Sequence, residues 1–197
     1  MARSARLLFG NTDRVPDLAY ATGIFVPDDF AWFQTPRGKT TVVLGPLEID
    51  RARRTARVDC CLDLEETKKR LGVDQQPFPR VLAAILKSRG IRSAEVPASF
   101  PVGLFQKLGK AGLRLKTAPE PFFPNRLRKS PLEIRHISQA LRAAEAGLQR
   151  GVDVLRASRI GTRQILRWGG SILTSERLRI EMESACLRAG ALAKDTI

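Results

Sequence analysis

The stretch Arg126-Leu127-Arg128-Lys129-Ser130-Pro131-Leu132-Glu133-Ile134 separates two parts of the chain. Ser130 can cap a helix whose first residue is Pro131, and Glu133 completes an S-x-x-E capping box. A proline at the first helical position leaves no backbone N–H unpaired there. The stretch therefore predicts that a long helix begins at Pro131.

Apolar residues mostly at spacings of three and four place one stripe on this helix. The stripe consists of Leu132, Ile134, Ile137, Leu141, Ala144, Leu148, Val152 and Leu155. Gly147 and Gly151 interrupt the helix, and they either weaken it or permit close packing. A second helix is predicted from an N-cap at Thr174 to about Ala189, with Gly190 as its terminator. Its stripe consists of Leu178, Met182, Ala185 and Ala189.

Upstream of this stretch, strand-like and helix-like segments alternate. Strands are predicted at 5–9, 30–34, 40–44, 58–62, 91–96 and 113–116, and helices at 15–22, 47–56, 65–71, 79–88 and 102–110. This alternation predicts an α/β layer with helices packed on a mixed sheet. Pro119, Pro121 and Pro124 follow, and they predict a stiff connector because proline lacks a backbone donor.

The composition is that of a globular protein, with 43% hydrophobic and 27% charged residues among 197. No apolar run approaches the roughly 18 residues that a membrane span needs, so we expect a cytoplasmic location. Cys60 and Cys61 are neighbours in a predicted strand, which directs their side chains to opposite faces, and Cys186 lies far away. We expect three reduced thiols.

The net charge of +14 raises the question of nucleic-acid binding. Residues 1–125 and 126–197 each carry +7, so the charge is not gathered in a basic tail. The densest basic run, at 51–57, lacks the interleaved aromatics that stack on bases. We expect no specific nucleic-acid binding and no membrane partner.

Several segments in order resemble the creatinase/proline-peptidase family of "pita-bread" metallopeptidases. The stretch 128–134 resembles the opening of that family's catalytic domain, typically a Lys, a small residue and then Glu-Ile. Similar pieces elsewhere are Asp17–Gly23 with its Tyr-x-x-Gly, the hairpin segment 38–44, Ala143-Ala144-Glu145-Ala146-Gly147 and Leu173-Thr174-Ser175-Glu176. The resemblance spans nearly the whole chain.

The resemblance implies an α/β fold in two parts. A creatinase-like N-terminal domain, with helices flanking a mixed sheet, is expected at 1–118. A Pro-rich linker follows at 119–129, and residues 130–197 are expected to form two helices of an incomplete, truncated pita-bread peptidase domain.

The family's reaction is hydrolysis of an N-terminal peptide bond, often one before proline. Two divalent metals such as Mn or Co activate a water and polarise the carbonyl. The resemblance implies two Asp, one His and two Glu as ligands, and none of these positions falls within this chain. His136 is expected on a helix surface, and Asp195 in a helix-to-strand connection. We therefore predict no catalytic, metal-binding or cofactor-binding residue here and no peptidase activity by the chain alone.

Two functions stay open. The first is an N-terminal fragment of a Xaa-Pro aminopeptidase- or dipeptidase-like metallopeptidase, and creatinase-like ancestry is equally compatible. The second is a non-catalytic module for peptide or protein binding or for dimerisation. The expected partners are a second copy of the chain or the missing C-terminal catalytic portion, and a peptide substrate only if that portion is present.

Overall fold

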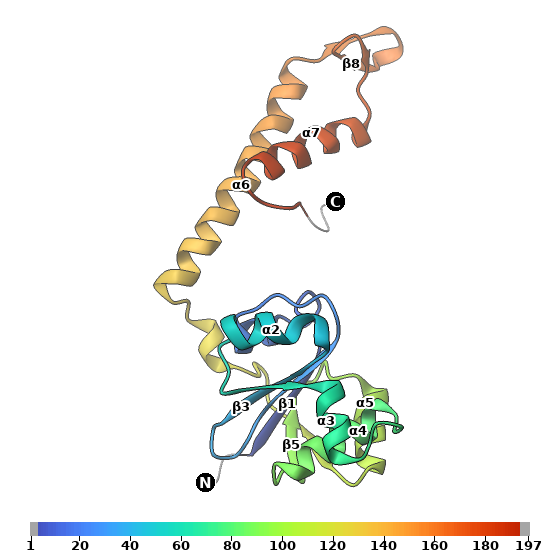
Figure 1. Cartoon of the computed structure of the whole chain (residues 1–197). Helices are drawn as coiled ribbons and strands as arrows, with labels where there is room; N and C mark the ends of the chain where they lie inside the picture. Colours follow the sequence, from blue (N-terminus) through green and yellow to red (C-terminus); the bar gives the residue numbers. More distant parts are fainter. Residues whose placement is uncertain (1–3, 194–197) are drawn as a thin grey trace. The chain divides into compact units, whose positions relative to one another are not determined.

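The computed structural model describes residues 4–193 and divides into two units, unit 1 from Met1 to Arg126 and unit 2 from Leu127 to Ile197 (Figure 1). The division falls inside the segment 119–129 for which the sequence predicts a linker. Each unit has its own sheet, and the two units are described separately below.

Unit 1 is built on a six-stranded mixed sheet with the strand order β4-β3-β2-β1-β5-β6. Its strands are β1 (Ala5–Gly10), β2 (Phe30–Gln34), β3 (Thr40–Leu44), β4 (Cys60–Asp63), β5 (Ser93–Val96) and β6 (Arg114–Thr117). β2 pairs antiparallel with β1 and with β3, and the three remaining pairs are parallel. The mixed sheet predicted from the sequence is confirmed.

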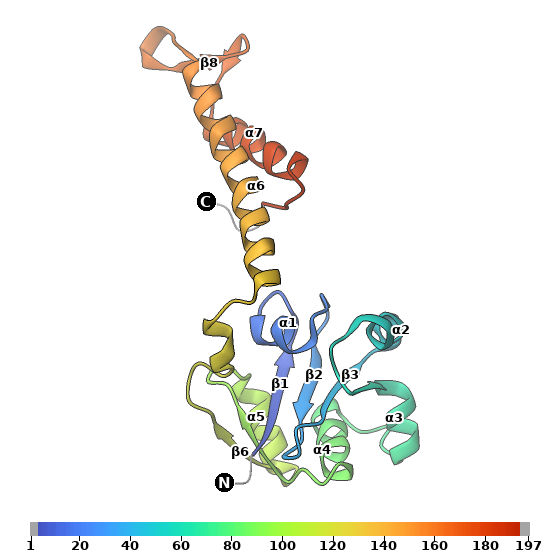
Figure 2. The ribbon, with the colours of Figure 1, turned by 90° about the vertical axis from the view of Figure 1, so that its left-hand side faces the viewer.

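Five helices cover both faces of this sheet (Figure 2). They are α1 (Pro16–Thr22), α2 (Pro46–Thr55), α3 (Leu64–Leu71), α4 (Phe78–Ser88) and α5 (Val102–Lys110). Figure 1 shows α3, α4 and α5 on one side and α2 on the other. Each predicted helix and strand of unit 1 lies within a few residues of its predicted bounds.

Alternation along the strands divides the core of unit 1 into two buried clusters. Phe33 packs with α4 and α5 in one cluster, and its neighbour Trp32 packs with α1 and α2 in the other. Cys60 contacts the first cluster and Cys61 the second, as predicted for neighbours in a strand. All three cysteines of the chain are free.

The proline-containing segment after β6 packs onto unit 1 as far as Phe123. Phe122 is buried, and the Arg6 guanidinium lies 3.9 Å from its ring centroid and 4.6 Å from that of Phe123. Burial lowers the pKa of Arg6, and the nearby carboxylates of Glu95 and Asp17 oppose that shift. These contacts fix the end of unit 1 against its own sheet.

Unit 2 consists of two helices joined by a small sheet. The elements are α6 (Pro131–Arg156), β7 (Arg159–Ile160), the 3-10 helix η2 (Thr162–Gln164), β8 (Leu166–Trp168), β9 (Ser171–Ile172) and α7 (Ser175–Arg188). The predicted capping box is confirmed, because Ser130 N donates to Glu133 Oε2 at 2.8 Å and Glu133 N donates to Ser130 Oγ at 3.3 Å. Thr174 caps α7 as predicted.

The sequence patterns do not predict the three-stranded sheet β7-β8-β9. Its strands have only two or three residues, too few for a period of two to be visible. Arg163 and Gln164, the central residues of the turn from β7 to β8, both have positive φ, a pattern that usually carries Asn-Gly. Gly169-Gly170, between β8 and β9, is the one hairpin signal within this small sheet.

Candidate functional site

The helix pair α6–α7 leaves many large apolar side chains exposed, so it is the candidate functional site. Along α6 the buried residues are small or β-branched: Ala143, Gly147, Gly151 and Val154. Met182 and Cys186 of α7 pack against the two glycines, and a Cβ added to Gly147 would come closer to Cys186 Sγ than the 3.0 Å that real contacts keep. Of the two interpretations of Gly147 and Gly151, a weakened helix or close packing, close packing is therefore confirmed.

Polar contacts hold the small sheet and both helices together. Arg150 Nε and Nη2 donate to Glu181 Oε2 at 3.0 and 2.6 Å, which links α6 to α7. The Trp168 ring of β8 lies 5.4 Å from the Arg150 guanidinium and 5.7 Å from that of Arg177. Arg177 also donates to the backbone carbonyl of Ile172. Trp168 thus joins the sheet to both helices through cation–π contacts.

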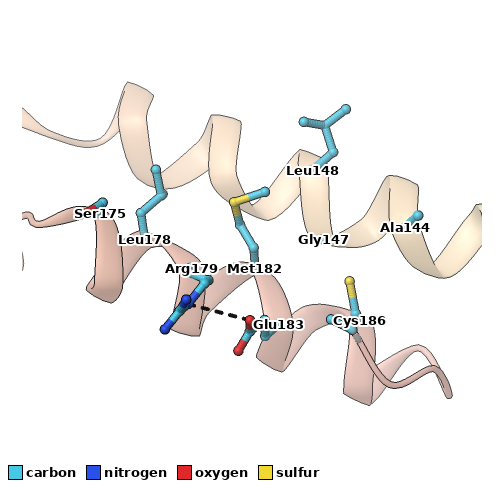
Figure 3. A pocket seen from close by; sticks show the side chains of 10 residues that line it. Ala144, Gly147, Leu148, Ser175, Leu178, Arg179, Met182, Glu183 and Cys186 are labelled. Carbon is cyan, nitrogen blue, oxygen red and sulfur yellow. Dashed lines mark ion pairs between the residues drawn. The ribbon is translucent and has the colours of Figure 1, made fainter. Parts of the chain in front are cut away.

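A groove of about 340 Å³ runs between the two helices (Figure 3). It is lined by Ala144, Gly147, Leu148, Ser175, Leu178, Arg179, Met182, Glu183, Cys186 and Ala193. Arg179 and Glu183 form an ion pair of 3.7 Å at its edge. The remaining lining is almost entirely apolar, so the groove suits an aliphatic side chain better than a polar ligand.

The large apolar stripe predicted on α6 remains at the surface. Ile134, Ile137 and Leu141 are 52 to 58% exposed, and Leu148 is 63% exposed. Successive helical residues are turned by about 100°, so the face formed by Ala143, Gly147 and Gly151 is a different one. We call the four exposed side chains, together with Leu155, the α6 stripe; Leu132, two residues before Ile134, lies on another side of the helix.

The predicted stripe on α7 needs a correction as well. Leu178 and Met182 of the predicted stripe line the groove, but Ala189 is exposed, and Cys186 continues the packed face in its place. Glycine on α6 makes room for a sulfur atom one residue beyond the predicted Ala185. The apolar residues of α6 recur with a helical period, and the face of α6 that packs against α7 is the one with the small residues.

The pKa shifts in this chain trace to caps and local pairs. A hydrogen bond from the Thr174 side chain lowers the pKa of Glu176 at the start of α7. In unit 1 a hydrogen bond from Lys116 lowers the pKa of Glu95, and burial raises the pKa of the Cys61 thiol. These shifts have a structural cause at each position.

His136 is exposed on α6, as predicted, and Asp195 lies outside the described residues. Within residues 4–193, no group of three or more His, Cys, Asp and Glu side chains is placed to hold a metal ion. The residues that the structure describes do not fit a two-metal centre, and no reaction step can be drawn through one here. No helix in this range is both long and apolar enough to cross a membrane.

No protein-family profile and no curated protein sequence matches the chain. Solved structures do. The X-Pro aminopeptidase from Thermotoga maritima MSB8 superposes with a TM-score of 0.71 at 14% identity, over 97% of this chain and 48% of its own. The Xaa-Pro dipeptidase from Bacillus anthracis superposes with a TM-score of 0.71 at 13% identity, over 95% of this chain and 45% of its own. The prolidase from Pyrococcus furiosus superposes with a TM-score of 0.69 at 10% identity, over 96% of this chain and 46% of its own.

The chain has the fold of an N-terminal portion of the Xaa-Pro peptidases. It spans less than half the length of these Xaa-Pro peptidases, while they account for nearly all of it. The expected fold class, a creatinase-like domain followed by two helices of a pita-bread domain, is confirmed. At identities this low, the likeness to Xaa-Pro peptidases establishes the fold alone.

Proposed function

We propose that this chain provides the N-terminal domain and the first helices of a Xaa-Pro aminopeptidase- or dipeptidase-like protein. In this proposal, polypeptide outside residues 4–193 supplies the catalytic strands and the ligands for two divalent metals such as Mn or Co. The support is the superposition on three such peptidases over 95 to 97% of this chain. The proposed reaction of the completed protein is hydrolysis of an N-terminal peptide bond.

The α6 stripe is the observation that carries the proposal. Burying a leucine or isoleucine side chain contributes about 1.5–3 kcal/mol, and the stripe leaves several of them half exposed or more. An apolar face of this extent on a folded protein marks an interaction surface. A sheet packed on α6 would cover it, and the groove beside α7 would receive one of the covering side chains.

Hydrolysis by the chain alone is not part of this proposal. The single histidine, His136, lies on the helix surface, and the described carboxylates are engaged in caps and ion pairs or face solvent. A cytoplasmic location completes the proposal, and three free thiols fit that location.

A peptidase assay of the isolated chain tests whether the metal ligands lie outside residues 4–193, as the proposal requires. Purified chain is incubated with Ala-Pro and Ala-Pro-Ala in the presence of Mn²⁺ or Co²⁺, and released amino acids are quantified against metal alone. A Xaa-Pro dipeptidase of the same fold serves as the positive control. We expect no release above the metal-only background, and turnover that follows the chain through two purification steps would contradict the proposal.

A dimerisation module is the second candidate, and the same stripe favours it. Ile137 and Leu141 would then face their counterparts in a second copy. Sedimentation of the wild type and of the double variant Ile137→Glu/Leu141→Glu separates the two candidates. If the wild type is a dimer and the double variant is a monomer, the second function is established. If the wild type is a monomer, the stripe is expected to bind a different polypeptide.

A further inference from the structure

The small sheet of unit 2 lies in a segment that carries only positive charge. No acidic residue occurs between Asp153 and Glu176. The same interval contains four arginines, Arg156, Arg159, Arg163 and Arg167. A surface segment normally mixes both signs, because like charges repel. This one does not, and its three arginines in and between the strands are all exposed.

The strand register places two of these arginines directly opposite each other. Arg159 of β7 pairs with Arg167 of β8, and Arg167 pairs in turn with Ile172 of β9. Side chains directly opposite in an antiparallel pair have Cβ atoms about 4.5–5.5 Å apart, and like charges there are destabilising. In the part of the chain that the structure describes, neither the Arg159 nor the Arg167 side chain has a hydrogen bond or an ion pair.

The other face of the sheet is the one that anchors it. Trp168 alternates with Arg167 along β8, and its ring contacts Arg150 and Arg177 of the helices. Arg167, on the opposite face, runs over the backbone of Gly161, where a Cβ would lie 3.0 Å from its Cδ atom. The contacts of Trp168 therefore anchor one face of the sheet to the helices, and Arg159, Arg167 and Ile172 lie on the opposite face. We call these three residues the arginine row.

We propose that the arginine row is a docking site for an acidic segment of a partner protein, in which carboxylates alternate with aliphatic side chains. A carboxylate can accept two parallel hydrogen bonds from a guanidinium, so two carboxylates would turn the repulsion between Arg159 and Arg167 into attraction. Ile172, which is 45% exposed at the end of the row, offers the aliphatic contact.

Charge and composition favour this partner over two others. A second copy would bring the same positive segment to the interface. Single-stranded nucleic acid binds through aromatic side chains that stack on bases, and the one aromatic side chain of this sheet, Trp168, is engaged by Arg150 and Arg177. The arginine row takes no part in peptide hydrolysis, so the test of the docking proposal does not depend on the result of the peptidase assay.

Fluorescence anisotropy with the full chain tests the proposal. The probe is a labelled octapeptide that alternates Glu and Ile, and a labelled oligothymidine is measured in parallel. The double variant Arg159→Gln/Arg167→Gln should bind the peptide about tenfold more weakly than the wild type, since each lost charge-assisted pair is a large loss. The control Arg37→Gln/Arg92→Gln removes the same charge from exposed positions of unit 1 and should change the affinity by less than about twofold.

A second variant guards against loss of binding through unfolding. Arg159→Glu puts opposite charges on facing strand positions, so the melting temperature should stay level or rise while peptide binding is lost. Equal peptide affinities for the two double variants would overturn the proposal. So would oligothymidine binding that is tighter than peptide binding and that falls in Arg159→Gln/Arg167→Gln, because the partner would then be a nucleic acid.

Discussion

Unit 1 buries most of its large apolar side chains, whereas unit 2 leaves most of those on α6 exposed. In unit 1, Trp32, Phe33 and Leu86 are at most 2% exposed, and helices cover both faces of the sheet. In unit 2, the buried residues of α6 are two glycines, an alanine and a valine, and the α6 stripe is about half exposed. Unit 1 therefore has a large buried core of its own, while unit 2 leaves much of the apolar surface of α6 uncovered.

The largest expected effect comes from testing that contrast directly. Phe33→Ala should lower the free energy of unfolding by about 3–5 kcal/mol, because the side chain is fully buried and its removal leaves a cavity. Leu141→Ala, on the α6 stripe, should change it by less than about 0.5 kcal/mol. Urea unfolding of both variants measures this. Similar losses would mean that the stripe is already covered in the isolated chain.

Close packing between α6 and α7 predicts a smaller loss. Gly147→Ala should destabilise unit 2 by about 1–3 kcal/mol, because the new Cβ would meet Cys186 and the backbone of Met182. Gly103→Ala is the matched control within α5, where nothing lies within 4 Å of the added atom. That variant should gain about 0.5–1 kcal/mol from the better helix propensity. Thermal unfolding followed by circular dichroism at the helix band distinguishes the two signs.

Removing a helix cap should lower the free energy of unfolding by about the same amount in either unit. Ser130→Ala removes the capping box of α6, and Asp63→Ala removes the cap of α3, whose carboxylate accepts from Glu66 N at 2.8 Å. Each should cost about 0.5–2 kcal/mol. Hydrogen exchange at the first turn of each helix reports the loss locally. If exchange in α6 is already complete in the wild type, its first turns are frayed and the cap is not formed.

The smallest effect concerns pH and unit 1. A hydrogen bond from the Thr40 hydroxyl lowers the pKa of the exposed Asp59, whose carboxylate also accepts from Thr40 N at 2.7 Å. A folded-state pKa below the unfolded one stabilises the fold at pH values above about 4, and this contribution is lost as the pH falls through the folded pKa. Asp59→Asn should therefore lower the urea midpoint at neutral pH, and the gap to the wild type should close in acid.

Local signals were enough to place most elements. Ser130, Pro131 and Glu133 fixed the start of α6, and Gly23 ended α1 in the left-handed conformation that glycine favours. These signals act within a few residues, so a single sequence contains them. The likeness to the Xaa-Pro peptidase fold rested on several such segments in order, among them 128–134, and the fold is confirmed by superposition.

Tertiary packing accounts for what the sequence did not predict. Hydrophobicity favours Ile137 and Leu141 as the packed face of α6, yet Gly147 and Gly151 let α7 approach the other face more closely. The sheet β7-β8-β9 has strands too short for a visible period and a turn without its usual residues. The opposition of Arg159 and Arg167 follows from that register, which no local pattern specifies.

Limited proteolysis of the isolated chain tests the contrast between the two units most directly. Trypsin finds arginines throughout both units, so survival reports local opening and not the supply of cleavage sites. We predict that unit 2 is cut first, at arginines from α6 to α7, and that a resistant fragment of unit 1 ending near Arg126 accumulates. Equal survival of the two units would show that unit 2 is complete by itself and would contradict the account.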